Sequence, residues 1–233
     1  MFNKKITLGA IALFAVINSS VAQNFMPAFT MFSHKETAEL YLKNGSKVTG
    51  TIKDIDRKKG LIEEITIIAN DKKTVYLPED IDYMYLPPSS YSAMTSKSAT
   101  ALNLSRSKDQ GMNQEFLDKG YAYFQSVKVM LKKKELTLLL QVVNPAFLGK
   151  ITVYNDPFAG ETASVGFGPV TLAGGIDKSY FVKVDNQVAY KLEKGDYKDY
   201  FDELFKSCPS ADAIEHVWRN FQQHVYEQNT NCK

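Results

Sequence analysis

Short segments of alternating apolar residues, separated by turn residues, recur through residues 36–87 of this 233-residue chain. This spacing predicts four to five strands, because alternation places every second side chain on one face of a sheet. Asn44-Gly45 is a strong hairpin signal in which both residues are expected to have positive φ. Residues 56–60 are expected to reverse the chain again. We therefore predict a small all-β unit over residues 36–87.

The segment from Asn44 to Ile52 reads N-G-x-x-V-x-G-x-I and resembles the opening hairpin of SH3- and Sm-like barrels. The resemblance implies a small barrel of that type over residues 36–87. Because such barrels occur in many unrelated proteins, it implies no function. Residues 23–35 form an apolar and aromatic lead, which is expected either to pack as an edge strand or to stay loose.

A second unit, rich in antiparallel strands, is expected over residues 114–233. It follows a linker at 88–113 that is dominated by Pro, Ser, Thr, Ala and Asn. Residues 136–143 are almost continuously apolar, which fits a strand buried on both faces. The lysines at 132–134 are interpreted as a hairpin turn before that strand.

The C-terminal end is predicted to hold two amphipathic helices that pack as a hairpin on the sheet. The first covers residues 197–207, and Pro209 ends it. The second is expected to start at Asp212, with Glu215 completing a capping-box pattern, and to continue to residue 229. The predicted fold class is therefore α+β, with a small barrel, a β-rich unit and a helical hairpin.

The first 22 residues have the three parts of a secretion signal. Lys4 and Lys5 precede an apolar run over residues 6–17, and small residues permit cleavage between Ala22 and Gln23. The run is shorter than the ~20 residues that a membrane-spanning helix needs. We expect a cleaved signal, a periplasmic or secreted mature protein, and no stable membrane span after cleavage.

The expected mature chain has no net charge. The whole chain has 28 basic and 26 acidic side chains, and the two lysines of the signal are removed with it, which leaves 26 of each. Nucleic-acid binding depends on a surplus of basic side chains that neutralise phosphates. A nucleic-acid partner is therefore not expected.

Cys208 and Cys232 are candidates for a disulfide, because cysteine pairs usually bridge in oxidising compartments. An unbroken helix over residues 212–229 would separate its ends by ~27 Å, whereas a disulfide tolerates only ~7 Å between Cα atoms. Pairing requires that helix to start late, or the tail to fold back. An unpaired Cys208 would be either a small core residue or a nucleophile with His224 or His216 as its base.

No cofactor or metal site is predicted. His216 and His224 are eight residues apart, whereas metal-binding pairs on a helix prefer i, i+4. The acidic pairs in 54–56 and 80–82 lack the further oxygens of a calcium loop. No Gly-Lys-Ser/Thr follows the glycines of residues 156–178, so they do not form a phosphate loop.

Aromatic side chains beside proline and glycine turns are candidates for contact with a glycan or another envelope protein. They are Tyr83, Tyr85, Tyr91, Phe158 and Phe167. Simple strand alternation with half-covered rings is the alternative explanation for the tyrosines.

Several segments together resemble a group of uncharacterised exported proteins of Bacteroidetes. They are the hairpin YLKNGSKVTGTI, the strands ITVY and KSYFVKVDNQVAYKL, the segment DYKDYFDELFKSCPS, and a final helix that ends in Cys. The resemblance covers the larger part of the mature chain. It implies export and this order of parts, and it implies no activity.

The sequence favours a non-enzymatic periplasmic or envelope protein that acts through contacts with another macromolecule. One alternative is a carrier of a small lipid or sugar, with its pocket between the glycine-rich residues 156–178 and the sheet. A second alternative is a thiol-dependent hydrolase that uses Cys208 and His224.

Overall fold

The computed structural model describes residues 25–90, 112–160, 165–167, 170–173 and 177–232. The described part is strand-rich, with 44% strand and 20% helix, so the α+β class is confirmed. The predicted cleavage junction between Ala22 and Gln23 lies outside the described residues, as do Tyr91 and the side chain of Phe167.

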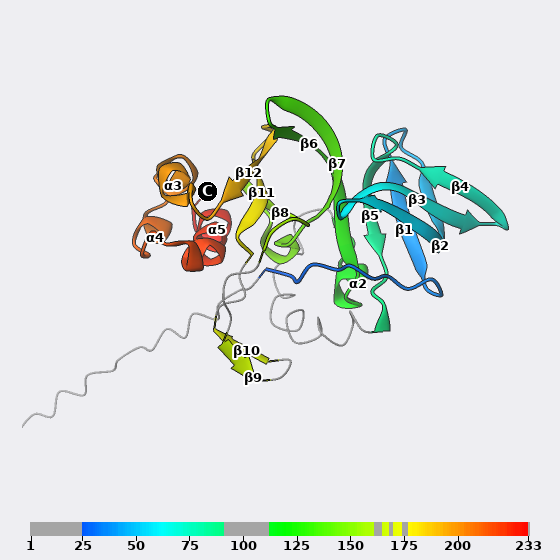
Figure 1. Ribbon diagram of the computed structural model, residues 1–233, viewed down its shortest axis with the longest axis horizontal. Helices are drawn as coiled ribbons and strands as arrows, with labels where there is room; N and C mark the ends of the chain where they lie inside the picture. Colours follow the sequence, from blue (N-terminus) through cyan, green and yellow to red (C-terminus); the bar gives the residue numbers. More distant parts are fainter. Residues whose placement is uncertain (1–24, 91–111, 161–164, 168–169, 174–176, 233) are drawn as a thin grey trace, which may run out of the picture.

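Six strands form a ring-like sheet in the order β1-β2-β3-β7-β6-β5, and β5 pairs with β1 to complete the ring (Figure 1). They are β1 (Thr37–Leu42), β2 (Lys47–Lys58), β3 (Leu61–Ala69), β5 (Ile81–Leu86), β6 (Ala122–Leu131) and β7 (Lys134–Gln141). The finer SH3- or Sm-like type of this ring stays a prediction. Strands from both predicted units take part, so residues 88–113 connect two strands of one sheet.

The ring has a weak seam between β3 and β7. These two strands meet at one residue pair, Ile62 with Leu139. The remainder of that edge of β3 is paired with β4 (Lys72–Tyr76), over residues 65–69. Because β4 occupies the same edge of β3, the pairing of β7 with β3 is confined to the end of β3 next to the β2–β3 turn.

Besides its pairings with β7 and β5 in the ring, β6 pairs in parallel with β12 (Ala189–Glu193), which extends the sheet beyond the ring. β11 (Ser179–Val184) and β8 (Ile151–Asn155) follow in order. A short helix α2 (Gln114–Asp118) precedes β6, and a 3₁₀ turn η2 (Pro145–Phe147) follows β7. The two-stranded hairpin of β9 (Val165–Phe167) and β10 (Val170–Ala173) lies apart from this sheet (Figure 1).

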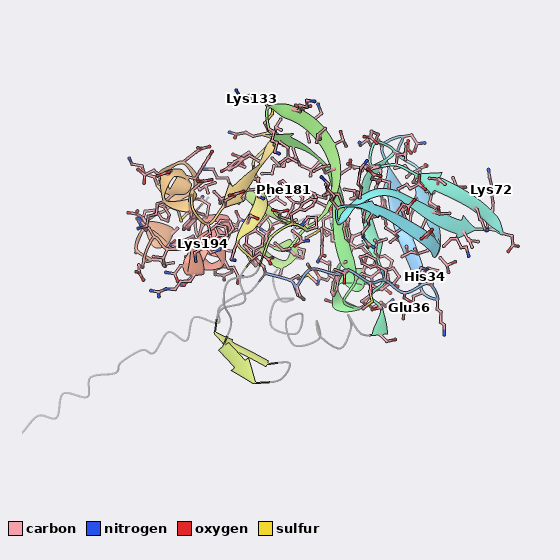
Figure 2. The ribbon with its side chains drawn as sticks, viewed as in Figure 1. His34, Glu36, Lys72, Lys133, Phe181 and Lys194 are labelled. Atoms are coloured by element: carbon pink, nitrogen blue, oxygen red, sulfur yellow. A yellow bond between two sulfur atoms is a disulfide. The ribbon has the colours of Figure 1, made fainter. Side chains whose placement is uncertain are left out.

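The predicted turns are present, with one difference in geometry. Lys132 and Lys133 have positive φ between β6 and β7, and Figure 2 shows Lys133 at the tip of that hairpin. At the first hairpin, Gly45 has a φ of +83°, whereas Asn44 keeps a negative φ. The Asn44 side chain instead accepts the amide of Ser46 at 2.9 Å, which supports a longer turn than the expected two-residue one.

The C-terminal helices pack together at one end of the molecule, against β8, β11 and β12 (Figure 1). They are α3 (Tyr197–Phe205), α4 (Pro209–Asp212), η3 (Trp218–Asn220) and α5 (Phe221–Thr230). The prediction that the second helix starts at Asp212 is wrong, since α5 starts at Phe221. Val217 has extended backbone, and the buried Trp218 donates its indole N–H to the carbonyl of Asp177. Burial of this ring outweighs the local capping signal.

Residues 25–35, the described part of the N-terminal lead, pack against the protein and form no strand. One β-bridge joins Phe32 to Pro88. The lead packs through its side chains across two hydrophobic clusters. Phe25 lies among aromatic rings of the helical end, whereas Phe29 and Phe32 belong to the cluster enclosed by the ring. Figure 1 shows this segment running along the sheet from the helical end to the ring.

Candidate functional site

A cavity of about 320 Å³ lies beside the β3–β7 seam. Its walls come from four segments that are far apart in the sequence, residues 28–30, 57–62, 139–141 and 155–159, and from the single residues Phe124 and Asp177. Most of the lining is apolar, with Phe29, Leu61, Ile62, Phe124, Leu139 and Leu140 contributing to it. A concave, mostly apolar cavity of this size falls at the lower end of the range of small-molecule sites.

The N-terminal wall is held in place by Gln141, which is 3% exposed. Its Oε1 accepts the amide of Phe29 at 2.8 Å, and its Nε2 donates to the carbonyl of Pro27 at 2.9 Å. A buried side-chain amide with both ends bonded fixes the main chain that it contacts. Alternation and turn patterns do not reveal this role, although a lone Gln inside the apolar run 136–143 is a signal for it.

The opposite wall is held by Asp156, whose carboxylate is fully buried. Oδ1 accepts the amide of Phe158 at 3.0 Å, and Oδ2 accepts the hydroxyl of Ser179 at 2.7 Å. The ammonium of Lys191 lies 3.1 Å from the same oxygen, so the buried charge has a partner. These contacts join the two ends of the glycine-rich segment at the cavity.

The β2–β3 turn contacts that wall closely at Gly60. Its φ is +78°, and a Cβ built there would lie 2.7 Å from the Cβ of Pro157. Only glycine combines this backbone conformation with so close an approach. The contact places the turn beside the segment that follows β8.

Arg57 is the basic residue of the lining. Its guanidinium lies 5.6 Å from the centroid of the Phe32 ring, and that ring makes an edge contact with Phe124. The side chain remains exposed at the rim, although neighbouring protein atoms replace enough water to lower the pKa of Arg57. The sequence predicts a chain reversal over residues 56–60, whereas β2 continues to Lys58 and positions Arg57 in a strand.

Cys208 and Cys232 form a disulfide, with 5.3 Å between their Cα atoms. The late start of α5 at Phe221 is one of the two conditions that this pairing required. Both cysteines of the chain are in this bond, so neither sulfur is a thiol. A nucleophilic role for Cys208 would need prior reduction.

His224 is buried in the aromatic core of the helical end. Its Nδ1 lies 2.6 Å from the hydroxyl of Tyr197, and its Nε2 faces the carbonyl of Ile214. A carbonyl accepts only, so Nε2 carries the proton and Nδ1 accepts from Tyr197. Burial lowers the pKa of His224 to about 4, which keeps the ring neutral near pH 7. His216 lies on the surface and stacks on Phe201.

The aromatic contact candidates occupy different environments. Tyr85 is 1% exposed, and its hydroxyl accepts the amide of Asn113 at 2.8 Å, so the ring contacts protein rather than solvent. Burial raises the pKa of Tyr85. Tyr83 is half-buried and stacks on Tyr41. Phe158 is 50% exposed, and its neighbours in the sequence, Pro157 and Ala159, line the cavity.

Within the described residues, no group of three or more His, Cys, Asp or Glu side chains is arranged to hold a metal ion. No helix in the described part is both long enough and apolar enough to cross a bilayer. Comparison with protein-family models, curated proteins and solved structures finds no significant match in any of the three. The candidate site therefore has to be interpreted from its own geometry.

Proposed function

We propose that this protein is exported and binds a small, mainly apolar ligand in the cavity beside the β3–β7 seam. The observation that carries the proposal is the cavity itself, about 320 Å³ in volume with mostly apolar walls. Buried hydrogen bonds from Gln141 and Asp156 hold two of these walls, and preformed walls reduce the entropy cost of binding. Residues from both ends of the glycine-rich segment line the cavity, which supports the ligand-carrier alternative.

Export is part of this proposal. It is supported by the secretion-signal pattern, by the resemblance to exported proteins of Bacteroidetes, and by the disulfide, because disulfides persist in oxidising compartments. We also propose that the six-stranded ring is a barrel of the SH3- or Sm-like type. N-terminal sequencing of protein isolated from a Gram-negative host should start at Gln23, and a cytosolic protein that retains Met1 would contradict it.

Ligand binding is tested with octan-1-ol, a neutral chain of suitable size, in NMR titrations of the mature protein. Ala159 lies on the cavity wall, and Ala159→Leu fills space there without removing a side-chain hydrogen bond. We expect this variant to weaken octan-1-ol binding at least about tenfold, as expected when bound apolar surface is displaced. Ala213→Leu, at an exposed alanine of the helical end, is the matched control and should bind normally.

Two outcomes would contradict ligand binding in this cavity. In one, the wild-type protein shows no saturable shifts with any eight-carbon probe, whether neutral or charged. In the other, Ala159→Leu binds as tightly as Ala213→Leu while both variants keep the wild-type melting temperature.

Contact with another macromolecule remains a second candidate function. The described observation in its favour is Phe158, half exposed beside the cavity wall. Affinity capture from an envelope fraction with wild type and Phe158→Ser tests it, and equal recovery of every captured protein would contradict it. The thiol hydrolase has less support, because Cys208 is in a disulfide.

A further inference from the structure

A register shift in the β2–β3 hairpin determines what Arg57 faces. Asp56 pairs with Glu64, but Arg57 pairs with Ile62, so Glu63 is left without an opposite residue. Without this bulge, Arg57 would lie opposite Glu63 and would have an acidic neighbour across the strands. Glu63 instead forms an ion pair with Lys58.

The shift also places Ile62, a cavity residue, opposite Arg57. Residues opposite each other in an antiparallel pair share a face of the sheet. Ile62 is 4% exposed and lines the cavity, so Arg57 lies on the cavity face at its solvent-exposed rim. The ring of Phe32 supports the guanidinium from one side.

Among the described residues, no carboxylate lies within ion-pair distance of Arg57, and burial is the sole cause of its lowered pKa. The guanidinium presents a planar set of donors that matches a carboxylate or a phosphate. It therefore offers a positive group with unused donors next to an apolar cavity.

We propose that the ligand carries one anionic group, a carboxylate or a phosphate ester, on a short apolar chain, and that Arg57 binds this group at the cavity rim. This inference rests on the proposed ligand-binding function. At roughly 30 Å³ for each water-sized group, a cavity of about 320 Å³ holds about ten heavy atoms. The eight-carbon chains of octanoate and octyl phosphate fit within this size, with the anionic group at the rim.

Two carboxylates of the lining bear on the preferred charge. Asp156 is neutralised by Lys191 and accepts two further hydrogen bonds, so its charge is already compensated. Asp177 also lines the cavity, and its negative charge adds to burial in raising the pKa of Tyr180. A cationic probe is needed to show which charge the site selects.

The test measures dissociation constants of the mature protein by NMR titration for octanoate, octyl phosphate, octan-1-ol and octylamine. Arg57→Gln removes the positive charge at the rim. Lys58→Gln is the matched control, because it removes the same charge one residue away and Lys58 does not line the cavity. Melting temperatures of both variants report whether the fold is retained.

We expect the wild type to bind at least one of the two anions at least about tenfold more tightly than octan-1-ol, with the more tightly bound anion identifying the headgroup. Arg57→Gln should weaken anion binding by roughly 10- to 100-fold, the range of a charge-assisted hydrogen bond. It should leave octan-1-ol binding unchanged, and Lys58→Gln should behave as wild type. Added salt should weaken binding of the anions alone.

The inference is overturned if octan-1-ol binds as tightly as both anions, or if octylamine binds best. It is also overturned if Arg57→Gln and Lys58→Gln have equal effects, because the effect would then not be specific to the guanidinium at the rim. In each of these cases the cavity still binds a ligand, so the proposed function stands. Absence of binding for every probe overturns both. If Arg57→Gln does not fold, Arg57→Lys should bind the better anion with intermediate affinity, and unchanged affinity would overturn the inference.

Discussion

Lowering the pH should destabilise this protein through His224, before most carboxylates become protonated. The imidazole is buried and neutral, and burial lowers its pKa from the usual 6.5 to about 4. The unfolded chain therefore binds a proton below pH 6.5 that the folded protein does not bind. This contribution to stability is complete above pH 6.5 and is lost as the pH falls from 6.5 towards 4.

The size of the effect follows from the two pKa values of His224. One pKa unit corresponds to about 1.4 kcal/mol, so the full difference corresponds to about 3 kcal/mol in the free energy of unfolding. About 2 kcal/mol of it should be lost by pH 5. For a domain of ordinary stability, this is a large fraction of the total.

Urea unfolding of wild type and His224→Asn at several pH values between 7.5 and 5 measures the effect. An Asn amide can replace the Nδ1 contact with Tyr197 but does not titrate. The variant should be less stable at pH 7.5, because aromatic packing is lost, and the difference between the two proteins should shrink as the pH falls. His216→Asn changes an exposed histidine and should keep the wild-type pH dependence.

The reasoning about His224 would be refuted by a difference between wild type and His224→Asn that stays constant, within about 0.5 kcal/mol, over this pH range. It would also be refuted if His216→Asn removed the pH dependence instead. In either case the buried imidazole would not be the group that senses the pH.

Three further changes test the framework around the cavity and the helical end. Replacing Cys208 and Cys232 by Ser opens a loop with a sequence separation of 24, which by chain entropy should lower the free energy of unfolding by about 3 kcal/mol; equal urea midpoints would contradict this. Asn229→Ala leaves buried main-chain groups at the η2–β8 connection without partners, and should cost roughly 1–3 kcal/mol in thermal or urea unfolding. Gly50→Ala would place a Cβ 2.3 Å from the carbonyl oxygen of Ile68, so the variant should lose the native packing of β2 on β3. A well-dispersed NMR spectrum like that of the wild type would contradict this packing.

The local structure of the ring could be predicted from short-range patterns. The alternation of apolar residues and the positions of the turn residues predict strands β1 to β5. The lysines at 132–133 form the predicted turn before β7. These features depend on neighbouring residues, whose conformational preferences are encoded within a few positions. The start of α5 could not be predicted in this way, because burial of Trp218 outweighs the capping signal at Asp212.

The candidate site depends on contacts between distant segments. Residues 28–30, Arg57, Leu139 and Asp156 are brought together only when β7 meets β3 at one pair and the N-terminal lead packs across both clusters. Sequence alone determined the strand-rich class, the neutral charge of the expected mature chain and the pair of cysteines. Tertiary structure decided which side chains line the cavity and that the cysteines bond, because both depend on strand register and side-chain burial over long sequence separations.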